Sequence, residues 1–180
     1  MLRFSALIDS LCDIIGKAVA WLTLGMVLVT FAVVALRYLF DSGYIWMQES
    51  VVWMHGLVFL LAAAYTLRQD EHVRVDIFYR RMTARGRAWV DLSGTLLLLI
   101  PSMLFVLITS LGFVAQSWRV LETSSEAGGL QALYLLKSVI PVAAVLLLLQ
   151  GAAIGLRALV VILTGEASNQ RDAHTPGGKI

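Results

Sequence analysis

Charge is what this sequence has least of. Charged residues make up 14% of its 180 positions, whereas a soluble domain carries about 25%. The single cysteine, Cys12, excludes an internal disulfide, so cysteine usage does not indicate the compartment. No nucleic-acid-binding motif and no long basic run is present, so we expect no nucleic-acid partner. Hydrophobic residues reach 59% and the mean hydropathy is +0.81, which indicates that most of the chain lies in lipid.

The apolar residues fall into long uninterrupted stretches. A helix that crosses a bilayer needs about 20 predominantly apolar residues. The sequence therefore predicts an all-α integral membrane protein with one transmembrane domain over residues 18–163. Its four transmembrane helices are expected at about 18–38, 46–67, 89–118 and 134–163.

The two ends of the chain differ from this domain. Residues 1–17 are amphipathic, with Asp9, Asp13 and Lys17 spaced four apart, as on a solvated helix face. This segment is either a short interfacial helix or the solvated extension of the first span. Residues 164–180 have the composition of a disordered tail.

The third span is longer than a membrane requires. If helical as far as Glu122, it would measure about 50 Å at about 1.5 Å per residue, against a hydrocarbon core of about 30 Å. Such a helix must tilt strongly, bend at Pro101 or project from the membrane.

Positive charge is concentrated on one side of the predicted membrane. Four spans place both termini on the same side. Arginine and lysine enrichment marks the cytoplasmic side, so we expect both termini and the 68–88 segment in the cytoplasm. Of the 14 basic residues, 11 fall there: Arg3, Lys17, Arg68, Arg74, Arg80, Arg81, Arg85, Arg87, Arg157, Arg171 and Lys179; Arg37, Arg119 and Lys137 fall opposite.

Residues 74–88, between the second and third spans, combine apolar positions at helical spacing with several arginines. This pattern is typical of an amphipathic helix lying on an anionic membrane surface. Its arginines would bind lipid headgroups: Arg80, Arg81, Arg85 and Arg87. The alternative is a solvated positive loop.

Polar and aromatic residues gather at both ends of the second span. Trp46, Glu49 and Trp53 open it, and Arg68, His72 and Asp76 follow its exit at a spacing of four. If helical, that row ties the second helix to the amphipathic segment. Otherwise it is ordinary interfacial polarity.

Three positions inside the spans have competing interpretations. Glu49 either binds a proton or cation, or stays near the headgroups and pairs with Arg37 or with a cation of a partner. His55 is either a ligand or a hydrogen-bonded packing histidine. Gly151-x-x-x-Gly155 permits close approach of a neighbouring helix.

The spans carry few of the mid-membrane polar groups that a transporter or pump uses. This favours an accessory subunit, without catalytic, metal-binding or cofactor-binding residues. A small multidrug exporter would need a carboxylate inside the first span, and this span has none. The main alternative is the membrane anchor of a respiratory enzyme, or a stand-alone membrane scaffold. A haem-binding anchor would require axial histidines on two helices, whereas His55 and His72 both belong to the second helix region.

The chain resembles the small membrane subunit of a TRAP (tripartite ATP-independent periplasmic) transporter. The resemblance covers the four-span layout over about residues 10–165. Its specific part is the aromatic and carboxylate that open the second helix, Trp46 and Glu49, and the residues that follow this helix: Arg68, His72, Arg74 and Asp76.

The resemblance implies a non-catalytic subunit of a three-part system in a bacterial inner membrane. In that family, a periplasmic binding protein delivers a small organic anion, and a large subunit of many helices carries it with sodium by an elevator motion. The small subunit joins the fixed scaffold of the large one and anchors it. Trp46 and Glu49 are then expected to pack against the large subunit or the first helix, and loops 40–46 and 119–133 to touch the binding protein transiently.

Overall fold

The computed structural model describes residues 2–69, 79 and 82–164, and the side chains from Ser5 onward. Four of its helices are long and apolar enough to cross a membrane, which confirms the predicted all-helical, four-span fold. The helices are α1 (Leu2–Phe40), α2 (Ile45–Arg68), α4 (Ala84–Gly94), the π-helix η1 (Thr95–Leu99), α5 (Ile100–Arg119) and α6 (Leu133–Thr164). The segments α4, η1 and α5 follow one another as a single helical span, Ala84–Arg119.

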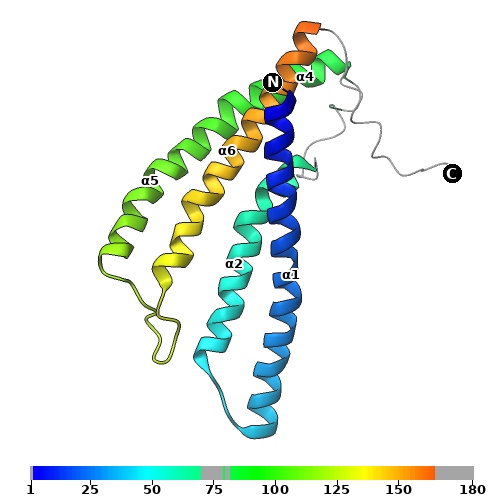
Figure 1. Cartoon of the computed structure of the whole chain (residues 1–180). Helices are drawn as coiled ribbons and strands as arrows, with labels where there is room; N and C mark the ends of the chain where they lie inside the picture. The colour runs from blue at the N-terminus through cyan, green and yellow to red at the C-terminus, as the bar shows by residue number, and fades with distance from the viewer. Residues whose placement is uncertain (1, 70–78, 80–81, 165–180) are drawn as a thin grey trace, which may run out of the picture.

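The helices form two pairs that meet at α6. Helix α1 packs along α2, and α5 packs along α6, while α6 also contacts α1, α2 and α4. Figure 1 shows the two pairs close together at the end where α1 begins and α6 ends, and spread apart toward the other end. In the most apolar stretch of α6, 39% of the residues are buried, against 6% in each of the other three spans. Helix α6 is therefore the centre of the fold.

Small side chains explain why α6 takes this position. Its buried residues include Ala143, Ala144, Gly151, Ala153 and Gly155. Small residues let helix backbones approach closely, which membrane helices need because lipid provides no hydrophobic drive to associate. A Cβ atom added at Gly151 would lie 2.4 Å from Leu99 Cδ2, so the predicted close approach at this glycine pair occurs against η1. Gly16 likewise lets α1 approach α2 closely, because its missing Cβ leaves room for the ring of Tyr65.

The third span is interrupted by a wide turn just before Pro101. The Ile100 N–H donates to the Thr95 carbonyl, five residues back, and Pro101 follows in the first turn of α5. Proline has no N–H to donate and crowds the preceding turn, so an ordinary helical turn is disfavoured there. Figure 1 shows this span crossing α6, with α4 on one side of it and α5 on the other.

Helix α1 is continuous from Leu2 to Phe40. The amphipathic 1–17 segment is therefore an extension of the first helix and no separate interfacial helix. Residues 74–78, 80 and 81 of the 74–88 segment lie outside the described residues, and α4 begins at Ala84, within the last part of that segment. Of the predicted 164–180 tail, only Thr164 is described, as the last residue of α6.

Large apolar side chains are exposed on the outward faces of the bundle. Trp21 and Phe31 of α1 are 73% and 72% exposed, Phe59 of α2 is 73% exposed, and Phe105 of α5 is 69% exposed. In a membrane these side chains meet lipid or the helices of another protein.

Candidate functional site

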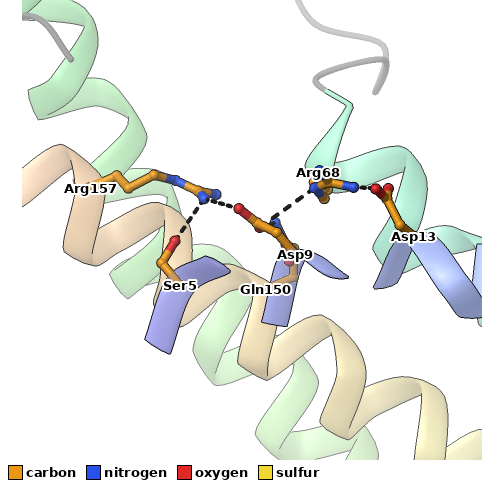
Figure 2. Close-up of polar contacts among 6 residues, drawn as sticks. All are labelled: Ser5, Asp9, Asp13, Arg68, Gln150 and Arg157. Atoms are coloured by element: carbon orange, nitrogen blue, oxygen red, sulfur yellow. Dashed lines mark hydrogen bonds and ion pairs between the residues drawn. The ribbon is translucent and has the colours of Figure 1, made fainter. Parts of the chain in front are cut away.

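A polar network joins three helices at the closed end of the bundle, and Asp9 of α1 is at its centre (Figure 2). One Asp9 oxygen accepts a hydrogen bond from Arg157 of α6, at 2.7 Å between Oδ2 and Nη1. The other, Oδ1, lies 3.7 Å from Nε of Arg68 of α2. It also accepts from Nε2 of the fully buried Gln150, at 3.2 Å. One carboxylate therefore contacts α2 and α6 together.

The network continues along α1 in steps of one turn. Ser5 Oγ accepts from Arg157 Nη1 at 2.8 Å, and Asp13 forms an ion pair with Arg68. Because Ser5, Asp9 and Asp13 are spaced four apart, they lie on one face of the helix. In Figure 2 that face points toward both guanidinium groups.

The charges in this network cancel. It contains two carboxylates and two guanidinium groups, whose side chains are 20–28% exposed. Charges taken out of water are costly unless they are paired and hydrogen-bonded, and here each has an opposite charge within reach. The carboxylates and guanidinium groups neutralise one another's charge, and the contacts between them fix the positions of α1, α2 and α6.

Sequence reasoning placed Asp9 and Asp13 on a solvated face, and that expectation is wrong because Arg68 and Arg157 cover them. It singled out Arg68 for a row with His72 and Asp76, both of which lie outside the described residues. The missed signal is that an amide and an arginine, Gln150 and Arg157, are spaced seven apart in the otherwise apolar stretch 139–163 of α6.

A second network joins the spread ends of the two helix pairs. Glu49, one turn into α2, accepts hydrogen bonds from the backbone N–H of Leu130, at 2.6 Å, and from the hydroxyl of Ser124. Both donors belong to the connection between α5 and α6. The partners of Glu49 are therefore groups of this connection, and no bond to Arg37 is found among the described residues. A Cβ at position 129 would lie 2.7 Å from Glu49 Oε2, which is too close. Glycine has no Cβ, so Gly129 fits beside Glu49.

The same connection is anchored to its flanking helices. Glu122 Oε2 accepts from Lys137 Nζ of α6 at 2.5 Å and from Ser117 Oγ of α5 at 2.6 Å. These two hydrogen bonds lower the pKa of the Glu122 carboxyl, the lysine bond having the larger effect. Nearby, Trp118 Nε1 donates to Ser138 Oγ at 2.8 Å. Side chains of α5 and α6 thus determine the shape of the connection.

Helix α5 ends in a backbone motif that starts this connection. Leu121 has a positive φ of 45°, and the N–H groups of Leu121 and Glu122 donate to the carbonyls of Trp118 and Ser117. This pairing is the Schellman motif, which closes a helix through one left-handed residue. Gly128, with φ of 84°, supplies a second left-handed position before α6.

The remaining predicted site residues have varied surroundings. Trp46 is 48% exposed and Trp53 is partly buried. Arg85 is exposed and Arg87 partly buried at the start of α4, where the Arg87 guanidinium lies 6.0 Å from the centre of the Tyr79 ring. Arg80 and Arg81 lie outside the described residues.

His55 does not pack against another side chain in the described part of this chain. Its side chain is exposed on α2, and no described residue bonds to it. Among the residues described, no three His, Cys, Asp or Glu side chains come together as a group that could hold a metal ion.

We predict that Asp9→Ala lowers the free energy of unfolding in detergent by about 2–4 kcal/mol, because it leaves both arginines without a shared counter-charge. Removing one partner of a fully buried pair costs about 3–5 kcal/mol, and the Asp9 side chain is 20% exposed. Tryptophan fluorescence during titration with a denaturing detergent measures the change. Lys17→Ala, at an exposed position of the same helix, is the matched control and should shift stability by less than about 0.5 kcal/mol. Equal stability of Asp9→Ala and the wild type would contradict the central role of Asp9.

We also predict that Glu49→Ala loosens the connection between α5 and α6, because the Leu130 N–H and the Ser124 hydroxyl lose their shared acceptor. Hydrogen exchange at the Leu130 amide should become severalfold faster, as measured by mass spectrometry on protein in nanodiscs. Glu126→Gln, in the same connection but with no described side-chain partner, is the carboxylate control. If the Leu130 amide exchanges at the same rate in Glu49→Ala and in the wild type, Glu49 does not hold this segment.

Comparison with known proteins identifies the family of this chain. The family model described as "Tripartite ATP-independent periplasmic transporters, DctQ component" matches residues 26–160. A Vibrio cholerae protein named "C4-dicarboxylate TRAP transporter small permease protein DctQ" is 36% identical over 62 residues. That alignment covers 34% of this chain and 27% of the relative. Because the family match extends over most of the chain and reaches into all four spans, the chain belongs to the DctQ-component family of tripartite ATP-independent periplasmic transporters, as a small permease subunit.

Proposed function

We propose that this chain is the non-catalytic small subunit of a sodium-coupled secondary transporter that imports a small organic anion. A periplasmic binding protein would deliver the anion, and a large permease subunit would carry it across the membrane. The small subunit would brace the fixed scaffold of that large subunit. Membership of the DctQ-component family supports the assignment, and the name of the Vibrio cholerae relative suggests C4-dicarboxylates as the first substrates to test.

The bracing role rests on one observation: four charged groups of the membrane-spanning helices hold helices to one another. Asp9, Asp13, Arg68 and Arg157 all pair within the chain. A group that binds and releases a transported ion needs free coordination capacity, whereas a brace needs fixed contacts. The network joins α1, α2 and α6 into one unit, against which an elevator domain could move.

Anchoring in the membrane would come from both ends of the bundle. We propose that the end carrying the Asp9 network faces the cytoplasm of a bacterial cell, since basic residues are concentrated there. Arg80, Arg81, Arg85 and Arg87 would then contact anionic lipid headgroups, each contributing about 1 kcal/mol. Trp46 and Trp118, both about half exposed at the opposite end, would sit in the other interfacial layer.

The binding protein would approach the end where the 40–46 and 119–133 segments lie. Glu49 bonds the second of these to the first turn of α2, directly after the first segment, so both segments belong to the surface at this end of the bundle. We propose that this surface is part of the docking rim for the binding protein.

Uptake in reconstituted vesicles tests the function. We predict that succinate enters vesicles under an inward sodium gradient when this chain, the large subunit and the binding protein are all present. Omitting this chain should reduce uptake at least about tenfold, while this chain alone should carry no flux. Sodium-dependent flux through this chain by itself, or full uptake without it, would contradict the proposal. A panel of other small organic anions in the complete system keeps the test independent of the choice of succinate.

Cross-linking tests the docking rim. We predict that a cysteine introduced as Gly43→Cys or as Ser125→Cys forms cross-links to the binding protein, whereas the native Cys12 is buried. Arg85→Cys, at the opposite end of the bundle, serves as the control and should not react with it. An added Cβ at Gly43 has no atom within 4 Å, so that substitution should leave the fold intact. Cross-links confined to the large subunit would exclude this chain from the rim.

A further inference from the structure

One face of α2 carries polar side chains in the membrane that nothing in the described part of this chain satisfies. Gln48, Val52, His55 and Phe59 are all exposed and recur at the spacing of one helix face. Val52 is 65% exposed and Phe59 is 73% exposed. Neither the imidazole of His55 nor the amide of Gln48 has a hydrogen-bond partner among the described residues.

The depth of His55 makes this exposure costly. His55 lies ten residues from the start of α2 at Ile45, or about 15 Å along the axis at about 1.5 Å per residue. That position is near the middle of a hydrocarbon core about 30 Å thick. Lipid tails offer no hydrogen bond, and ionisable side chains inside membranes almost always face protein or a water-filled cavity.

The outer face of α1 does not share this feature. The outer face of α1 carries Trp21, Leu24, Leu28 and Phe31, all of which are exposed and apolar, so lipid can cover it fully. Helix α2 is flanked by α1 on one side and by α6 on the other. Its remaining face, which carries His55 near mid-membrane, is therefore a place where the bundle requires a polar partner.

We propose that the Gln48–Val52–His55–Phe59 face of α2 binds a transmembrane helix of the large permease subunit, which presents a hydroxyl or amide side chain to His55. A neutral imidazole has one donor and one acceptor, and a serine, threonine, asparagine or glutamine can meet either. Val52 and Phe59 flank the imidazole and pack against the partner helix, while Gln48 adds a second hydrogen bond nearer the membrane surface. This inference rests on the proposed function, because it specifies where the large subunit binds.

Cysteine cross-linking in the assembled complex locates the face. Val52→Cys and Phe59→Cys should cross-link to the large subunit, and neither substitution removes a polar contact within this chain. Leu28→Cys and Phe31→Cys on α1 are the matched controls, and they should react with a lipid-soluble maleimide and form no cross-link. The reverse pattern, or cross-links between two copies of this chain, overturns the inference.

Substitution of His55 tests the chemistry. His55→Leu should lower recovery of the complex in detergent by about 3- to 30-fold, the range expected for interhelical hydrogen bonds in membranes. His55→Gln should restore most of it. The isolated subunit carrying His55→Leu should melt at the same temperature as the isolated wild-type subunit, because His55 has no described contact to lose. Unchanged recovery of His55→Leu overturns the inference.

The two proposals fail in different ways. If the wild-type chain does not associate with the large subunit, the proposed function itself is wrong. If it associates through α1 or α5 while the α2 cysteines stay in lipid, the function stands and this inference falls.

Discussion

The carboxylate of Asp9, held between two guanidinium groups, is the contact on which the arrangement of the helices depends. In a bilayer, apolar helices gain little by leaving lipid for one another. Close packing and polar contacts must therefore determine which helices associate. Asp9 reaches Arg68 of α2 and Arg157 of α6 from α1, and so it determines how the α1–α2 pair meets the central helix. The small residues of α6 then allow the backbones to come close enough for those contacts to form.

If the Asp9 network were the only polar contact between the two helix pairs, their other ends could move apart. The Glu49 bonds to Ser124 and Leu130 prevent this, because they join the pairs again at the other end. A frame attached at both ends resists both splaying and twisting. That property suits a subunit whose proposed task is to stay still while a neighbouring domain moves.

The four spans could be predicted from the sequence because length and apolarity alone define a membrane helix. The contacts between the spans could not. Helical spacing shows that Asp9 and Asp13 share a face, but it does not show what covers that face, and Arg157 is 148 positions away from Asp9. The bonds of Glu49 likewise join residues 75 and 81 positions apart. Pro101 signalled a disturbance in the third span, yet the resulting π-turn also depends on how η1 fits against Gly151. In each case the missing information is which distant segment lies opposite.

The four paired charges and the neutral polar groups of α2 are used differently, and the cost of exposing each kind of group to lipid explains why. Wherever a subunit lies in the membrane without its partners, an unpaired charge is far more costly in lipid than a neutral imidazole or amide. Charges therefore have to be neutralised within the chain, as Asp9, Asp13, Arg68 and Arg157 are. Polar groups without a fixed charge, such as His55 and Gln48, can remain unpaired in the isolated subunit because exposing them to lipid costs less free energy. Pairing them with a partner subunit later still favours the complex. By this reasoning, an exposed neutral polar residue at mid-membrane marks an interface between subunits, and a charged pair marks the interior of a subunit.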